Sequence, residues 1–485
     1  MKLVKSLLLG SAAGLLAVAS SQAADLPYRK AAPVEYVKIC DAHGAGFWYI
    51  PGTDTCLHVG GNVTFEYRVQ DVKRQFPYTF NPAGTVTANG RPTRAYAFGA
   101  PVSIRSRDST GSYARGRVQL DARNTTAYGT LRTFISLDMN HKTGVYGVNG
   151  DNVDIDKAFI QWAGLTAGRY QSVFDFYADD WNNEAIRNSD SDVNGIAYTY
   201  TFGGGFTATI SVEDHNDRLA AAPPGAGFPN TGPYGSDPRG GSVIAGGYRS
   251  PDLVGQLDWT QTWGDIRVTG AAHQENTVFS PLIALDGTDT FGDQTKWGFA
   301  VLGGVMFNLP TLAAGDQLWI EGEYTSGALA YQQVSNGNRN FTGNGLLQPD
   351  YDAVWARVAN AGSPTGFSDK LTLPTAWSVM AAGQHYFTPQ LIGRLFGSYI
   401  DVKYNSAVTS ELITSNWNEY RIGGQLYWEQ IYGGKPFDIG VEAMYARLNQ
   451  KIPAGGTPFA ALVGGLPANK NVDGFEGRIH IERDF

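Results

Sequence analysis

Apolar and polar residues alternate one by one through many short stretches of this chain. Residues 59–70 and the last twelve residues, 474–485, show the pattern most clearly. In the terminal stretch the apolar set is Phe475, Gly477, Ile479, Ile481 and Phe485, against Glu476, Arg478, His480, Glu482 and Asp484. Because a strand points successive side chains to opposite faces, each stretch predicts a strand with one apolar and one wet face. Taken alone, the terminal stretch also fits the edge strand of a soluble sandwich.

The same alternation recurs along the chain and predicts about sixteen strands. These strands are expected to start near residues 58, 112, 129, 154, 165, 194, 205, 251, 265, 294, 316, 374, 391, 416, 436 and 473. The pattern is weakest near residues 154, 165 and 391. No linker divides the chain into separate globular domains.

Short and long connections alternate between these strands. Tight turns are expected near residues 124–128, 203–205, 263–265, 310–315, 388–389 and 433–436. Long polar loops are expected at 71–111, 214–250, 332–373 and 450–472. This asymmetry is typical of outer-membrane barrels and has no counterpart in a soluble sandwich. The sequence therefore predicts an all-β fold, a 16-stranded antiparallel transmembrane β-barrel with short periplasmic turns and long extracellular loops.

Aromatic residues gather near the expected strand ends. They are Trp259, Trp263, Trp297, Trp319, Tyr427, Trp428, Tyr432 and Phe485. Each could be an ordinary core residue, but together they favour the aromatic girdle found where a barrel meets the membrane interface.

The N-terminus has the order of a secretory signal peptide. Lys2 and Lys5 precede an apolar run over residues 7–18, and small residues follow up to Ala23. We expect residues 1–23 to be removed, 24–57 to form a periplasmic segment and 58–485 to form the barrel. No later stretch reaches the ~18–20 apolar residues of a membrane helix, so an integral membrane protein would have to cross with strands.

Composition and charge exclude several function classes. The formal net charge is −8, and removal of Lys2 and Lys5 makes it −10; no basic block suggests nucleic-acid binding. The motifs of serine hydrolases, zinc proteases and P-loop proteins are absent. The seven histidines are scattered without metal-ligand spacing, so we expect no catalytic residues, no metal and no cofactor. A calcium ion on the acidic loop described below remains an alternative.

The two cysteines, Cys40 and Cys56, lie sixteen positions apart near the N-terminus. In an exported chain they are expected to form one disulfide, and closing so short a loop stabilises by about 3 kcal/mol in the chain-entropy model. Metal ligation is the alternative, but no cluster of histidines or cysteines accompanies them.

One connection, residues 172–192, mixes acids with aromatic residues. The acids Asp175, Asp179, Asp180 and Glu184 alternate with four aromatic side chains, which a solvated loop would not need. We expect the loop to fold into the lumen, opposite arginines on the inner faces of early strands, namely Arg68, Arg115, Arg117, Arg123 and Arg132. Acids facing arginines would set a transverse field across a narrow constriction. The alternative is an external acidic loop, with the arginines merely solvated in a wide pore.

Three segments carry a family resemblance. Residues 40–61, CDAHGAGFWYIPGTDTCLHVGG, closely resemble the N-terminal signature of the alphaproteobacterial outer-membrane porins. Residues 164–177, GLTAGRYQSVFDFY, and the C-terminal strand ending in phenylalanine are also similar. The resemblance implies a sixteen-stranded barrel, a homotrimer, a third loop folded into the pore at 173–193, and Phe485 as the signal read by the barrel-assembly machinery.

The resemblance also implies passive diffusion of small hydrophilic solutes across the outer membrane. The expected surroundings are outer-membrane lipid and lipopolysaccharide. A substrate-selective channel for sugars or anions, with an aromatic track along the lumen, is the first alternative. An outer-membrane enzyme with a Ser/His pair on the rim is the second, and the chain lacks a nucleophile motif for it.

Overall fold

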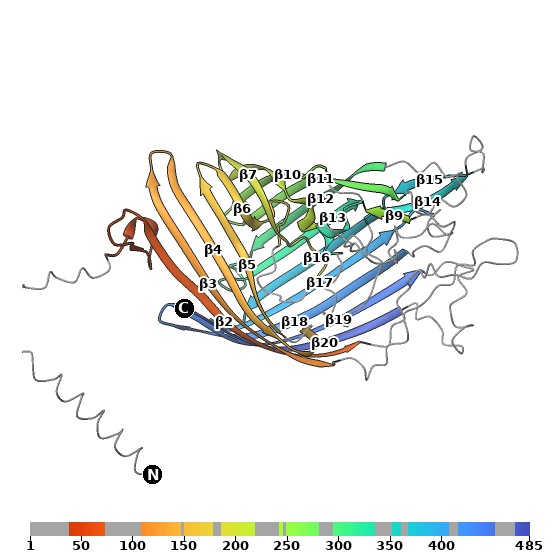
Figure 1. Cartoon of the computed structure of the whole chain (residues 1–485). Coiled ribbons are helices and arrows are strands. Elements are labelled where there is room, and N and C mark those ends of the chain that lie inside the picture. The colour runs from red at the N-terminus through yellow and green to blue at the C-terminus, as the bar shows by residue number, and fades with distance from the viewer. Residues whose placement is uncertain are drawn as a thin grey trace, which may run out of the picture.

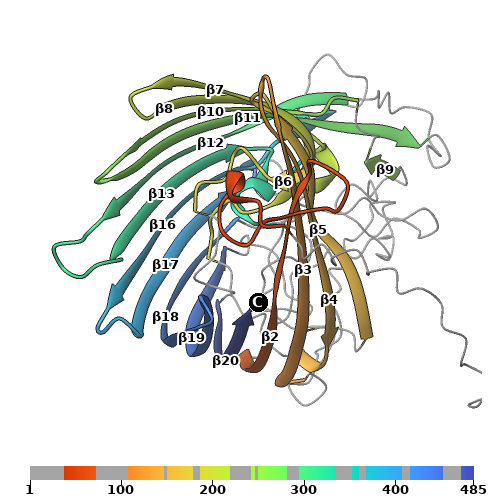
Figure 2. The same cartoon turned by 90° about the vertical axis from the view of Figure 1, so that its left-hand side faces the viewer.

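Strands dominate the computed structural model of the protein. It describes residues 38–72, 108–146, 150–177, 186–218, 242–245, 249–280, 294–334, 352–359, 367–406, 416–451 and 471–485. Within these residues sixteen long strands form a closed antiparallel ring (Figures 1 and 2). In chain order they are β2 (Cys56–Val72), β3 (Thr110–Thr126), β4 (Gly129–Lys142), β5 (Gly150–Trp162), β6 (Leu165–Gln171), β7 (Asp192–Gly203), β8 (Phe206–Glu213), β10 (Asp252–Gln261), β11 (Gly264–Ser280), β12 (Gln294–Asn308), β13 (Gln317–Ser326), β16 (Thr375–Tyr386), β17 (Leu391–Lys403), β18 (Asn416–Tyr432), β19 (Lys435–Lys451) and β20 (Asn471–Asp484).

The ring closes between its first and last strands. β2 pairs with both β3 and β20, and Asn62 lies opposite Asp484 in the closing register. The backbone N–H of Phe485 donates to the carbonyl oxygen of Gly61 at 3.0 Å. The C-terminus therefore lies at the seam, at the same end of the barrel as the N-terminal segment (Figure 1). Closure leaves no open sheet edge, which is what a strand-built membrane protein requires.

All sixteen expected strands are present, and each starts within four residues of its expected position. The six expected tight turns are confirmed as well. A seventh, at residues 163–164 between β5 and β6, is not apparent in the sequence because it lacks the Asn-Gly or Asp-Gly pair typical of such turns. Ala163 and Gly164 both adopt positive φ, 50° and 87°, as a two-residue type I′ hairpin requires.

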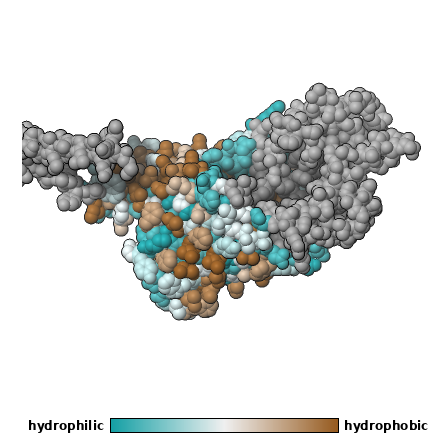
Figure 3. Space-filling view, turned by 60° about the horizontal axis from the view of Figure 1, so that its bottom comes forward, coloured by the Kyte–Doolittle hydropathy of each residue, from teal (hydrophilic) through white to brown (hydrophobic). Residues whose placement is uncertain are grey.

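The two faces of the barrel wall differ as the alternation predicts. On β2 the outward side chains Val63, Phe65 and Tyr67 are exposed, whereas Glu66 and Arg68 point inward and are buried. Apolar side chains also form patches over the outside of the barrel in the space-filling view (Figure 3). An apolar exterior around a charged interior is the arrangement that lipid outside and water inside demand. Among the residues described, no helix is long and apolar enough to cross a membrane.

Short strands and turns lie at the ends of the ring. β1 (Trp48–Tyr49) pairs with β2, β9 (Ser242–Ala245) pairs with the end of β11, and β14 (Val354–Ala359) pairs with β15 (Phe367–Thr372) in a separate hairpin. The 3₁₀ turns that matter below are η3 (Gly144–Tyr146), η4 (His215–Arg218) and η6 (Leu329–Gln332). A further turn, η1 (Asp41–His43), lies in the N-terminal segment.

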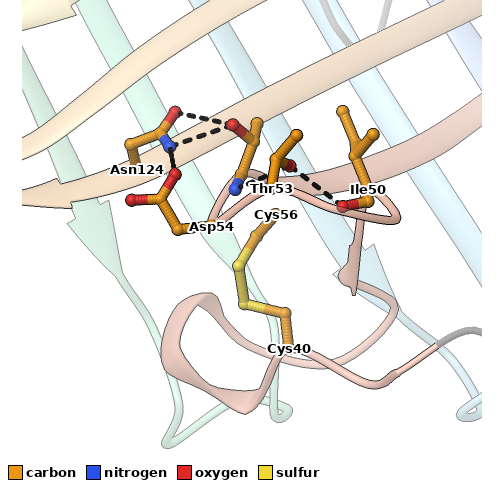
Figure 4. The surroundings of a disulfide bond; sticks show 7 residues. Cys40, Ile50, Thr53, Asp54, Cys56 and Asn124 are labelled. Atoms are coloured by element: carbon orange, nitrogen blue, oxygen red, sulfur yellow. Dashed lines mark hydrogen bonds between the residues drawn. A yellow bond between two sulfur atoms is a disulfide. The ribbon is translucent and has the colours of Figure 1, made fainter.

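A disulfide joins the N-terminal segment to the start of the barrel. Cys40 and Cys56 are bonded and buried, which confirms the expected pairing (Figure 4). The Asn124 side-chain amide on β3 donates to the carboxylate of Asp54 at 3.2 Å and to the hydroxyl of Thr55 at 3.0 Å. The closed loop is therefore attached to the rim by hydrogen bonds as well as by the covalent bond.

Reducing this disulfide should open the loop without opening the barrel. The chain-entropy model assigns the cross-link about 3 kcal/mol, and the sixteen-strand ring does not depend on it. Hydrogen exchange should show faster exchange over residues 40–55 after reduction, with an unchanged β circular-dichroism spectrum. A Cys40→Ser/Cys56→Ser variant should exchange fast with or without reductant. Equal protection of the loop in both redox states would contradict this account.

Candidate channel constriction

Two described stretches of the chain between β6 and β7 lie inside the ring. We call residues 172–177 and 186–191 the inner segment. Its backbone binds β13, which lies five strands beyond β7 around the ring. The N–H of Tyr177 donates to Glu321 Oε2 at 3.1 Å, and the N–H of Ser189 donates to Glu323 Oε1 at 2.7 Å. The inner segment therefore reaches across the lumen instead of projecting outward from the rim.

Aromatic side chains pack the inner segment onto the interior wall. Phe174 meets Tyr331 edge-on with ring centroids 4.7 Å apart, and Phe176 lies 4.9 Å from the Trp319 ring. Phe176 also covers Gly304 on β12, where a Cβ atom would come within 2.2 Å of the ring. These contacts confirm that Phe174 and Phe176 pack against protein, while Trp181 of the same connection lies outside the described residues.

Asp175 anchors the inner segment through a buried ion pair. Its carboxylate accepts hydrogen bonds from Arg218 of η4 and from the Ser191 N–H, both at 2.7 Å. Arg218 also donates to Ser189 Oγ at 2.8 Å. Burial alone would lower the pKa of Arg218, but the charge of Asp175, aided by Tyr331 and Glu213, holds it above its ordinary value. The charge of Asp175 is thus neutralised by Arg218. The other acids expected at the constriction, Asp179, Asp180 and Glu184, lie outside the described residues.

A second buried ion cluster holds the far side of the inner segment. Arg187 Nε donates to Glu419 Oε1 at 2.8 Å, and Arg421 Nε donates to the same oxygen at 2.6 Å. A third bond runs from Arg187 to the carbonyl oxygen of Gln333 at 2.6 Å. The three charged side chains are 0% exposed. This cluster is not among the predictions from the sequence, although Glu419 and Arg421 occupy alternate positions on the inner face of β18.

The five expected arginines all lie on inner faces of β2, β3 and β4, but none stands alone. Each forms an ion pair with a carboxylate on the interior of the same wall. The pairs are Arg68–Glu476 at 3.2 Å, Arg115–Glu482 at 3.4 Å, Arg117–Asp138 at 2.6 Å, Arg123–Asp121 at 2.7 Å and Arg132–Asp121 at 3.0 Å. Arg117 also reaches Asp156 at 2.9 Å. The charges on this wall are therefore paired. The electric field that they set across the lumen is much weaker than the field that the arginines alone would produce.

A polar cavity of about 260 Å³ lies on the same wall, between β2, β3, β4, η3 and β20. Its lining is Thr64, Glu66, Arg68, Tyr113, Arg115, Lys142, Tyr146, Arg478 and His480. Tyr113 and Tyr146 stack with centroids 5.5 Å apart, and Arg68 lies 4.0 Å over the Tyr146 ring. The inner wall thus offers charged and hydrogen-bonding groups to whatever enters the lumen.

Comparison with known protein families identifies the family of this chain. A family model described as "Porin subfamily" matches residues 25–462. The chain belongs to this porin family. It is 31% identical to porin Omp2b of Brucella suis over 340 residues, which is 67% of this chain and 75% of that porin. It is also 31% identical to porin Omp2b of Brucella neotomae over 341 residues, which is 68% of this chain and 76% of that porin.

The fold also has a counterpart among solved structures. The outer membrane channel DcaP of Acinetobacter baumannii superimposes with a TM-score of 0.54 at 13% identity, covering 90% of this chain and 99% of that one. At such low identity the similarity concerns the fold alone. The expected family and fold class are therefore confirmed.

Family and architecture together establish the role of this porin. It forms a channel in the bacterial outer membrane, and the family indicates a channel rather than an enzyme. The residues that the sequence analysis missed are the partners inside the lumen, chiefly Arg218, Glu321, Glu323 and Glu419. The three glutamates occupy inward strand positions that alternation could have shown, whereas Arg218 lies on the 3₁₀ turn η4; alternation does not show which side chain meets which.

Proposed function

We propose that this porin passes ions and small hydrophilic solutes by passive diffusion through a water-filled lumen, narrowed by the inner segment. The observation that carries the proposal is the attachment of that segment to β13 and β18 on the opposite wall. A segment held across the lumen restricts the size of solutes, while paired charges along the wall keep the passage wetted. Apolar solutes would have to displace that water without replacing its hydrogen bonds.

A substrate-selective channel is the alternative, and the aromatic residues argue against it. A solute that slides along aromatic rings needs their faces open to the lumen. Here Phe174, Phe176 and Tyr177 are buried and pack on Tyr331 and Trp319. Their contacts serve to fix the inner segment, so these three rings offer no open face to a sliding solute.

Several features of the mature porin belong to the same proposal. We expect residues 1–23 to be removed on export, 24–57 to face the periplasm and 58–485 to form the barrel. Phe485, 53% exposed at the seam, suits recognition by the barrel-assembly machinery. A homotrimer surrounded by outer-membrane lipid and lipopolysaccharide is expected, with exposed apolar residues of the outer face at the contacts.

Planar-bilayer recording and liposome swelling test the proposal. General diffusion predicts stepwise conductance that rises almost linearly with salt concentration, and sugar uptake that falls steadily with molecular size. Conductance that saturates at low salt, or fast uptake of one large sugar, would favour the selective alternative. Well-folded protein that conducts no ions would contradict both.

Replacing Asp179 and Asp180 together with asparagine should reduce the preference for cations. Two carboxylates in a narrow passage raise the local cation concentration, so their loss should move the reversal potential in a salt gradient toward the anion side. An Asp41→Asn/Asp151→Asn variant removes the same two charges from exposed positions and should leave the potential unchanged. An unaltered reversal potential in the first variant would place those acids outside the constriction.

A further inference from the structure

Two histidines that are distant in the chain meet inside the barrel. His215 belongs to η4, and His273 lies on the inner face of β11, followed two positions later by Glu275. Their imidazole rings stack with centroids 4.0 Å apart and an interplanar angle of 14°. All three side chains are buried, although the sequence shows no spacing that would have linked them.

Asp252, the first residue of β10, orients both rings. Its carboxylate lies 3.0 Å from His215 Nδ1 and 2.8 Å from His273 Nδ1. It also accepts the hydroxyl of Tyr331 at 2.7 Å. A neutral imidazole that donates its Nδ1–H to a carboxylate carries the lone pair on Nε2, which is how proteins commonly orient metal-binding histidines.

The opposite edge of the His273 ring faces a carboxylate. His273 Nε2 lies 3.1 Å from Glu275 Oε1, and two such atoms at this distance need a proton or a metal ion between them. One donor atom from each of His215, His273 and Glu275 lies within 4.8 Å of the others. Two imidazoles and one carboxylate are therefore close enough for one ion to bind all three once the His215 ring turns out of its stack on His273.

The surrounding charges favour a cation at this point. Asp252 and Glu275 are in the cluster itself, and Glu213 and Asp175 lie close to it through their interactions with Arg218. The guanidinium of Arg218 stacks over Tyr331 at 4.4 Å and pairs with Asp175, so it offsets only part of this negative charge. A divalent ion would complete the balance.

We propose that His215, His273 and Glu275 form a binding site for Zn²⁺ or a similar transition-metal ion, with Asp252 supporting the two histidines. Imidazole and carboxylate donors suit zinc, whereas calcium and magnesium prefer oxygen donors throughout. Ligand atoms on tetrahedral zinc lie about 3.3 Å apart, so the widest separation must close by about 1.5 Å. His215 lies on a short 3₁₀ turn that is not one of the paired strands, so this shift does not disturb strand pairing.

A metal ion here would act on the constriction. The ion would link η4 to β11. Arg218, on the same turn as His215, donates a hydrogen bond to Asp175 of the inner segment. Zinc would therefore stabilise the anchor of the inner segment from within the barrel. This consequence does not depend on which solutes the porin transports.

Zinc binding by the folded, tag-free porin tests the proposal. After removal of metals with EDTA, isothermal titration calorimetry with ZnCl₂ should show one ion per chain. Glu275→Gln and His273→Gln should each weaken binding at least tenfold, and Co²⁺ should produce the strong visible absorption of a tetrahedral site in the wild type only. His385→Gln removes a half-exposed histidine that pairs with Asp316 instead, and should bind zinc normally.

Circular dichroism must show that each variant keeps its strands. If His273→Gln fails to fold, Glu275→Gln decides, since glutamine preserves the size of the side chain and its hydrogen-bonding capacity. Folded wild-type porin that binds no zinc, or equal zinc affinity in wild type and Glu275→Gln, would overturn the proposal. Channel recordings play no part in this test, so its outcome is independent of the proposed transport function.

Discussion

Replacing Glu419 with alanine should raise the single-channel conductance of this porin and make the open channel noisier. The Glu419 carboxylate lies between Arg187 of the inner segment and Arg421 of β18, with all three side chains buried. Its removal takes away the carboxylate that the two guanidinium groups share. Breaking a buried ion pair in this way costs about 3–5 kcal/mol, enough to release the inner segment from β18 and widen the passage.

Planar-bilayer recordings measure the conductance, and limited proteolysis measures the release of residues 186–191. Glu429→Ala is the matched control, because Glu429 lies on the same face of β18, nearer the turn that leads to β19, and is only half-buried. Glu419→Gln keeps the shape but not the charge and should give an intermediate effect. Wild-type conductance together with wild-type protease resistance in Glu419→Ala would show that the ion cluster does not hold the constriction.

Replacing Gly304 with alanine should displace the inner segment at its contact with β12. The added Cβ would lie 2.2 Å from Cδ1 of Phe176, whose ring is confined by Trp319 at 4.9 Å and Arg267 at 5.2 Å. The ring must therefore move, and overpacking of this kind typically costs about 1–3 kcal/mol. We expect a changed conductance and a lower thermal unfolding temperature.

Gly303→Ala is the matched control, since it adds the same methyl group one residue away. Gly303 points outward, and an added Cβ would have nothing within 4 Å. Combining Gly304→Ala with Phe176→Leu should restore part of the stability, because the smaller side chain makes room. If Gly303→Ala and Gly304→Ala behave alike, the contact between Phe176 and β12 does not control the channel.

The strand predictions succeeded because alternation is a local property. Each strand of this barrel has one face toward lipid and one toward water, so the alternation of residues 59–70 recurs along the chain, most weakly near residues 154, 165 and 391. The turn at Ala163 and Gly164 escaped notice because positive φ can be adopted without the usual turn residues. Even there, the strands on either side were located correctly.

Charge pairing was harder to anticipate. Asp175 was expected among the acids of the constriction, yet it is buried against Arg218, and the lumen arginines are paired with carboxylates on their own wall. The alternation shows that an acidic or basic side chain faces the lumen, but it does not show which side chain it pairs with. The partner depends on how far neighbouring strands are staggered and on where the inner segment reaches the opposite wall.

The sequence by itself determined the number of strands, their two faces, the alternation of short and long connections, and the porin family. These follow from side-chain polarity at successive positions and from one distinctive N-terminal motif. Only the tertiary structure decided that Arg187 meets Glu419 and that His215 stacks on His273. Such contacts join residues far apart in the chain, and closure of the ring, rather than any local preference, brings them together.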